Sequence, residues 1–161
     1  MTRRPLSNPD EIMRVALRWL GAREYCREEL RRKLEDRGFE ARQVRSVVRR
    51  LVEMGYLSDA RFAEAFLRSR MRRGETPLLA AMKARRHGVS EAALSAAYEA
   101  ACGQFDAEEA CRALLARRDP ASRYVYDERE RVRQVRFLRN KGFDTATILR
   151  VMNERRADMP E

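Results

Sequence analysis

The stretch KLEDRGFEARQV, residues 33–44, has an outline that returns as KARRHGVSEAAL at residues 83–94 and as FLRNKGFDTATI at residues 137–148. Each copy has a basic or imidazole residue, then Gly, then Phe or Val, then a short polar stretch and an apolar periodic segment. Glycine at such a place supplies the left-handed backbone that ends a helix, and the following apolar residue packs back onto that helix. The stretch therefore predicts a helix, a glycine turn and a second helix, three times.

The spacing of these turns predicts a repeat protein. The shared glycines, Gly38, Gly88 and Gly142, are followed six and ten residues later by core-type residues: Val44, Leu94 and Ile148, then Val48, Tyr98 and Met152. Repeats of this length are typical of stacked helical units, none of which buries its apolar face alone. We predict an all-α fold, an elongated array of three tandem three-helix repeats over 1–57, 58–104 and 105–157, with a tail at 158–161.

Helix-start signals support nine helices in all. The expected N-terminal caps are Asn8 before Pro9, Cys26 as a weak substitute for Ser, Ser58 or Asp59, Thr76 before Pro77, Ser90, Asp106, Asp127, and Asp144 or Thr145. The third helix should run from about Ala41 to Met54, and Gly55 should end it. RRDPASRYVY, residues 117–126, is the longest expected loop, and no segment alternates as a strand.

Composition excludes several classes of protein. The chain is 44% hydrophobic, yet no apolar run approaches the ~18 residues of a membrane span, and MTRRPLSNPDEIMRV at the N-terminus lacks the apolar core of a signal peptide. We expect a cytoplasmic protein that makes no membrane contact. Cys26, Cys102 and Cys111 are irregularly spaced and His87 is the one histidine, so we expect buried thiols and no metal site.

The residues that catalysis needs are also missing. The chain has no glycine-rich phosphate loop and no Ser/His/Asp set. His87 falls at a helix end, where it complements the helix dipole, and the pairs Glu28/Glu29 and Glu108/Glu109 fall in first helical turns for the same reason. We expect no enzyme activity, no cofactor and no small-molecule substrate.

The net charge of +10 favours nucleic acid or an anionic partner surface, although an arginine excess can also reflect genomic base composition. The densest positive segment is central, because residues 61–90 carry eight basic and two acidic residues. Candidate partner-binding residues fall in three groups: Arg42, Arg45 and Arg49; Arg61, Arg68 and Arg72; and Lys83, Arg85 and Arg86.

The first two groups form outward rows on their helices. On the helix after Ser58, the apolar stripe of Phe62, Ala63, Phe66 and Leu67 lies opposite the second group. Each row is either a solvated face or a partner contact, and the third group can equally complement a helix dipole. Arg70 falls on the apolar stripe, so we expect it to point inward and pair with a carboxylate or with helix-end carbonyls.

Two segments carry a family resemblance: ALRWLGAREYCREELRRKLEDRGF, residues 16–39, and LVEMGYLSDARFAEAFLRSRMRRG, residues 51–74. They resemble the RecX family, regulators of the bacterial RecA recombinase, and FLRNKGF matches the third unit. The matching residues are Gly55, Tyr56, Leu57, Asp59, Phe62, Ala63, Arg70 and Gly74. The chain departs from the pattern at Cys26, where Ser is usual, and at Ala84, where Leu is common.

The resemblance implies a non-enzymatic modulator, mainly an inhibitor, that acts in homologous recombination, DNA repair and the SOS response. Such a protein would bind the groove of RecA–DNA filaments and limit filament extension, ATPase, strand exchange and coprotease activity. Its arginine rows would meet RecA carboxylates or the phosphates of single- or double-stranded DNA. Capping of filament ends or internal blocking, and a monomer or a swapped dimer, remain alternatives.

The rival interpretation is a helix-turn-helix transcription regulator, since RRHGVSEAALSAAYEA, residues 85–100, looks like a helix, a turn and a second helix. The second helix, from Glu91 to Ala101, offers no Arg, Lys, Asn or Gln to base edges. The helix with Gln43, Arg45 and Arg49 is the better candidate reader of DNA.

Overall fold

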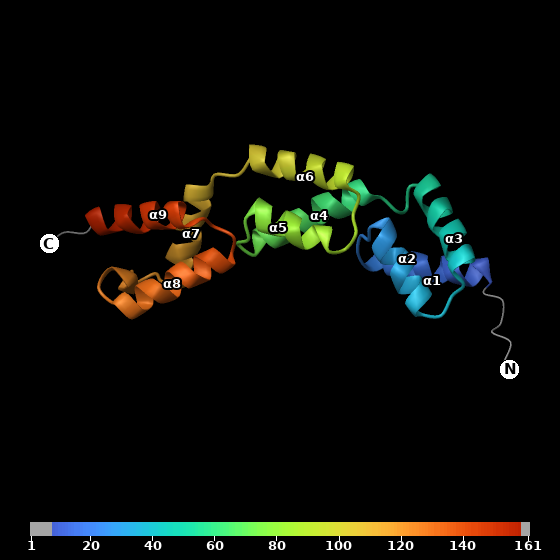
Figure 1. The fold of residues 1–161 in the computed structure, drawn as a ribbon, viewed down its shortest axis with the longest axis horizontal. Coiled ribbons are helices and arrows are strands. Elements are labelled where there is room, and N and C mark those ends of the chain that lie inside the picture. The colour runs from blue at the N-terminus through green and yellow to red at the C-terminus, as the bar shows by residue number, and fades with distance from the viewer. Residues whose placement is uncertain (1–7, 159–161) are drawn as a thin grey trace. The chain divides into compact units, whose positions relative to one another are not determined.

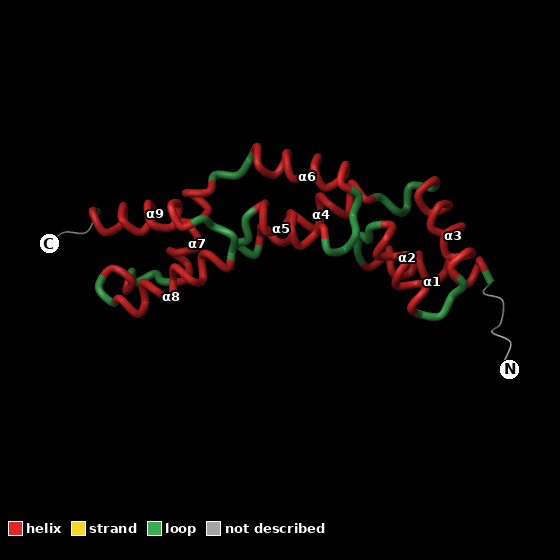
Figure 2. Tube along the Cα trace, viewed as in Figure 1, coloured by secondary structure: helices red, strands yellow, loops and turns green. Residues whose placement is uncertain are grey.

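The computed structural model describes residues 8–158, which form nine α-helices, one 3-10 helix and no strand (Figures 1 and 2). The helices are α1 (Pro9–Ala22), α2 (Arg27–Asp36), α3 (Ala41–Glu53), α4 (Asp59–Arg72), α5 (Pro77–Arg85), α6 (Glu91–Gly103), α7 (Ala107–Arg118), η1 (Arg123–Val125), α8 (Glu128–Asn140) and α9 (Thr145–Ala157). The predicted all-α class is confirmed. Residues 1–7, and residues 159–161 of the predicted tail, lie outside the described part.

Side-chain caps fix most helix starts as predicted. Asn8 accepts a hydrogen bond from the amide of Asp10, and Asp106 accepts one from the amide of Glu109. Where the sequence left two candidates, Ser58 caps α4 through the Arg61 amide, and Asp144 caps α9 through the Thr147 amide. Cys26 stands at the cap position of α2, but its thiol makes no capping bond.

The glycine turns have the predicted conformation. Gly38, Gly88 and Gly142 have φ angles of +103°, +84° and +99°, which L side chains rarely adopt. The amide of Phe39 donates to the carbonyl of Leu34 at 3.3 Å, and the amide of Phe143 donates to that of Leu138 at 3.2 Å. These bonds close the helix ends, so the repeated sequence outline is a repeated local structure.

The expected loop at 117–126 is more ordered than the sequence suggested. It contains η1, whose Tyr124 side chain is buried among the residues of α7, α8 and α9. The Asp119 carboxylate accepts a hydrogen bond from the Tyr124 amide at 3.0 Å and so fixes the turn. Burial of one aromatic ring supplies the apolar contact that holds this segment.

The described residues divide into two compact units. The first unit reaches to Leu67 and includes Met82–Ala97, and the second comprises Arg68–Ala81 and the chain from Tyr98. The core of the first unit includes Ile12, Leu30, Leu34, Val44, Val47, Leu51 and Leu57; that of the second includes Cys111, Leu115, Tyr124, Leu138, Ile148 and Met152. The finer division at 1–57, 58–104 and 105–157 remains a prediction.

Within residues 8–158 no helix is long and apolar enough to cross a bilayer. The same part of the chain holds no group of His, Cys, Asp or Glu side chains that could ligate a metal ion.

Candidate interaction surface

One carboxylate joins the starts of two helices in the first unit. Asp59 accepts a hydrogen bond from the amide of Arg27 and another from the amide of Ser90, both at 2.9 Å. These amides open α2 and precede α6, where a negative charge is favourable. Asp59 therefore holds the turn at residues 87–90 beside the N-terminus of α2.

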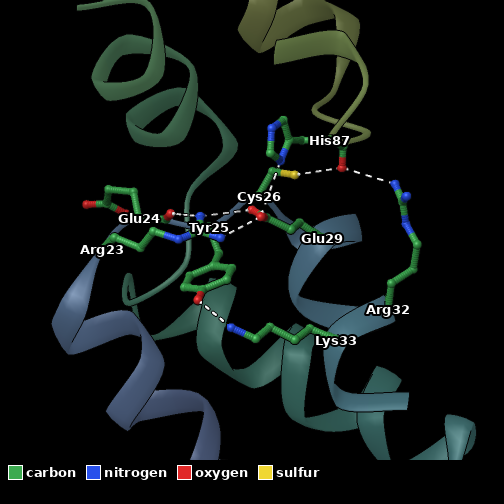
Figure 3. Close-up of polar contacts among 8 residues, drawn as sticks. All are labelled: Arg23, Glu24, Tyr25, Cys26, Glu29, Arg32, Lys33 and His87. Atoms are coloured by element: carbon green, nitrogen blue, oxygen red, sulfur yellow. Dashed lines mark hydrogen bonds and ion pairs between the residues drawn. The ribbon is translucent and has the colours of Figure 1, made fainter. Parts of the chain in front are cut away.

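A polar network fastens the same turn to α2 (Figure 3). The carbonyl of His87 accepts hydrogen bonds from the Cys26 thiol at 3.3 Å and from the Arg32 guanidinium at 3.0 Å. The His87 ring lies 3.2 Å from Glu29, which also accepts from Arg23 at 2.6 Å. His87 therefore links the turn to α2. The sequence predicted a structural role for His87 at the end of a helix, but it did not predict these contacts.

Burial and charge set the protonation of this network. Burial raises the pKa of the Cys26 thiol, so the thiol keeps the proton that it donates to the His87 carbonyl. Burial also acts against the charged form of Glu29. The hydrogen bond and charge of Arg23, with those of His87, outweigh that effect and lower the pKa of the Glu29 carboxyl.

The fastened turn forms one wall of a groove of about 540 Å³ in the first unit. Its lining consists of Arg27, Glu28 and Arg31 from α2; Arg45, Val48, Arg49 and Val52 from α3; and Asp59, Gly88 and Ser90. The α3 residues recur at a spacing of three and four, so they form one face of that helix beside the buried stripe of Val44, Val47 and Leu51.

Charges in the groove are unequally compensated. Glu28 accepts from Arg31 at 2.9 Å, and Asp59 lies 3.5 Å from the guanidinium of Arg27. Arg45 and Arg49 have no carboxylate partner in the part of the chain that the structure describes. The groove thus presents two uncompensated guanidinium groups beside two valines, which suits a ligand with carboxylates next to an apolar side chain.

The other candidate residues differ in their surroundings. Arg42, Arg68 and Arg72 are exposed, as predicted; Arg86 is exposed as well, and Lys83 is half-buried. Arg85 is exposed and lies 2.8 Å from Glu91. Arg70 is 30% exposed and its guanidinium lies 3.7 Å from the buried Glu75, so the predicted inward pairing is confirmed.

Arg61 is exposed, as predicted, and its side chain also has partners within the first unit. Its guanidinium donates to the Gly55 carbonyl at 2.7 Å and to Glu24 at 3.2 Å. Arg61 therefore caps the end of α3 with its charge while it lies on the exposed face of α4 that the sequence predicted.

Comparison with known proteins agrees with this architecture. The chain has the fold of a helical repeat protein. The family models of the first and second three-helix domains of RecX match residues 13–51 and 58–97. Regulatory protein RecX of Halorhodospira halophila is 38% identical over 83% of this chain and 81% of its own length. That of Pseudomonas savastanoi pv. phaseolicola is 35% identical over 95% and 97%. The chain belongs to the RecX family.

A solved structure supports the fold independently of close sequence similarity. RecX from Lactobacillus salivarius superposes with a TM-score of 0.71 over 91% of this chain and 95% of that chain, at 18% identity.

Proposed function

We propose that this protein is a non-enzymatic modulator, mainly an inhibitor, of the RecA recombinase in the cytoplasm. In this proposal it binds the groove of RecA–DNA filaments and limits filament extension, ATPase, strand exchange and coprotease activity. Membership of a family whose relatives are named regulatory proteins supports the proposal. The observation that carries it is the pair of uncompensated guanidinium groups, Arg45 and Arg49, in a groove that Val48 and Val52 also line.

The groove suits a protein partner better than DNA. Val48 and Val52 offer apolar surface, and a phosphate backbone has no apolar group that could pack against it. Glu28 and Asp59 would repel phosphates. Gln43, one of the candidate base readers in the rival interpretation, is half-buried with its side-chain oxygen enclosed. We therefore favour carboxylates of RecA over DNA as the main contact, with Arg42 extending the contact along α3.

Co-sedimentation with preformed RecA–single-stranded-DNA filaments tests the proposal. The parent chain should pellet with filaments, and the double variant Arg45→Glu/Arg49→Glu should lose at least about tenfold in affinity, because attraction becomes repulsion. Arg14→Glu/Arg18→Glu is a matched control, since both residues are exposed, four apart on α1 and in the same unit.

Three results would contradict the proposal or its site. A parent chain that stays in the supernatant excludes the filament as partner. Equal losses in both double variants mean that only net charge matters and that the groove is not the contact. Enrichment of one motif from random DNA would favour the transcription regulator.

A further inference from the structure

A small polar pocket lies in the second unit and shares no residue with the groove of the first unit. Its lining comes from the end of α7, from η1 and from the first half of α8, and every lining residue is polar or charged: Arg118, Asp119, Arg123, Glu130, Arg133 and Gln134. The pocket has a volume of about 210 Å³, which is the share of about seven water molecules in the liquid. It therefore has room for a small polar ligand.

Two of the lining side chains are buried, since Asp119 is 4% exposed and Gln134 is 3% exposed. The Asp119 carboxylate accepts a hydrogen bond from the Tyr124 amide, and the Gln134 amide group donates one to Glu130 at 3.4 Å. The side-chain oxygen of Gln134 is buried and accepts no hydrogen bond within the described residues. A buried acceptor without a donor is unfavourable, so a ligand that donates a hydrogen bond to Gln134 would be stabilised here.

The arginines of the pocket are only partly neutralised. Arg133 lies 2.7 Å from the carboxylate of Glu130. Arg118 and Arg123 have no carboxylate partner in the described part of the chain, and the Arg118 guanidinium lies 3.9 Å from the centroid of the Phe137 ring. Because Arg118 and Arg123 come from different elements and line the same small space, an oxyanion in the pocket can accept hydrogen bonds from both.

The backbone next to Arg123 has an unusual conformation. Ser122 has a φ angle of +52°, and between residues 8 and 158 it is the one residue other than glycine with a positive φ. Its amide donates to the carbonyl of Asp119 and its carbonyl accepts from the amide of Val125, both at 3.0 Å. Strained residues persist where the surrounding structure fixes them, and they are frequent at ligand sites. These two bonds fix the backbone from which Arg123 reaches the pocket.

We propose that this pocket binds a phosphate group that carries or adjoins a hydroxyl group, as in hydrogen phosphate or a sugar phosphate. Arg118 and Arg123 donate to the phosphate oxygens, and the hydroxyl group donates to the side-chain oxygen of Gln134. An internal phosphate of a DNA strand has no such hydroxyl group. The carboxylates of Asp119 and Glu130 also disfavour a polyanion, so the nucleic acid backbone suits the pocket less well.

Isothermal titration calorimetry of the full chain without RecA tests this inference separately from the proposed function. At about pH 7.5, phosphate and sulfate are tetrahedral anions of similar size and charge, but only phosphate keeps a proton that it can donate. At constant ionic strength, inorganic phosphate should therefore bind about fivefold more tightly than sulfate. Gln134→Leu removes the acceptor and should abolish this preference.

A pair of double variants tests the arginines independently of the buried glutamine. Arg118→Ala/Arg123→Ala should lose at least about tenfold in phosphate affinity and keep the helical content of the parent by circular dichroism, because both residues are exposed. Arg117→Ala/Arg129→Ala is the matched control, since these residues are also exposed, lie in the second unit and do not line the pocket. The control should bind phosphate like the parent.

Ribose 5-phosphate separates the two sources of the phosphate group. Tighter binding of ribose 5-phosphate than of inorganic phosphate assigns the pocket to a sugar phosphate, and equal or weaker binding assigns it to free phosphate. Four results would overturn the proposal: no binding of either compound up to about 10 mM, equal binding of phosphate and sulfate, a preference that survives Gln134→Leu, or equal losses in the two double variants.

Discussion

Replacement of Gly88 by Ala should destabilise the first unit more than replacement of Gly38 by Ala. Both glycines have positive φ, so a side chain at either costs on the order of 1–2 kcal/mol. At Gly38 the added methyl group meets nothing within 4 Å. At Gly88 it would displace Glu28 and the Arg32 guanidinium, which donates to the His87 carbonyl. Overpacking and the lost hydrogen bond together cost a further ~1–3 kcal/mol.

Urea unfolding followed by the fluorescence of Trp19 measures this difference, because Trp19 packs against the core of the first unit, which holds both glycines. With a slope of ~1–3 kcal/mol per M, Gly38→Ala should lower the midpoint by about 0.5–1 M and Gly88→Ala by about twice that or more. Equal shifts would mean that the Gly88 turn does not pack on α2. The claim that Glu28 and Arg32 of α2 hold the Gly88 turn would then fail.

Three further predictions concern single side chains of the first unit and its boundary. Arg61→Ala should cost about 1 kcal/mol in thermal unfolding because it removes the bond to the Gly55 carbonyl, whereas the exposed Arg68→Ala should cost less than ~0.5 kcal/mol; equal losses would contradict the capping role. Cys26→Ser should raise the melting midpoint, by roughly 0.5–1 kcal/mol of stability, because a hydroxyl can both cap α2 and donate to His87; a lower midpoint would mean that packing of the buried thiol outweighs the cap. The pKa of Glu29 lies below its ordinary value of 4.5, so the stabilisation of the fold by the Glu29 carboxylate is complete above pH 4.5 and is lost as the pH falls through the lowered pKa. The parent should therefore be more stable than Glu29→Gln at neutral pH, and this difference in the free energy of unfolding should shrink on acidification. A difference that stays constant with pH would contradict the ion pairs of Glu29.

Local signals in the sequence were sufficient for the helices and their ends. A cap such as Asn8 or Asp144 acts on amides two or three residues away, and a glycine turn such as Gly38 closes on its own helix. Interactions of this range are visible in the residue order. The inward orientation of Arg70 also followed from its place on the apolar stripe of α4.

Contacts between distant segments could not be predicted in the same way. The sequence predicts Asp59 only as a helix-start residue. Its carboxylate in fact accepts hydrogen bonds from the amides of Arg27 in α2 and of Ser90, which are 32 and 31 residues away. The bond from Cys26 to His87 spans 61 residues. Val48 and Val52 have the spacing of core residues, so their place in a groove appears only when α2 and the 87–90 turn are positioned beside them.

The arginine rows illustrate the same limit. The sequence placed Arg61 and Arg68 on one outward face, and both side chains are at least partly exposed. In the structure the two arginines differ in their partners, because Arg61 donates hydrogen bonds to Glu24 and to the carbonyl of Gly55. Helical periodicity gives the direction of a side chain, but its partners depend on tertiary packing.

The most direct test of the proposed function is the ATPase activity of RecA on single-stranded DNA with this protein added at less than one copy per RecA. A protein that blocks filament growth from within the groove need not bind every subunit, so hydrolysis should fall under these conditions. The Arg45→Glu/Arg49→Glu variant should leave hydrolysis near the level of RecA alone. Unchanged hydrolysis with the parent protein at equimolar concentration would contradict its role as a RecA modulator.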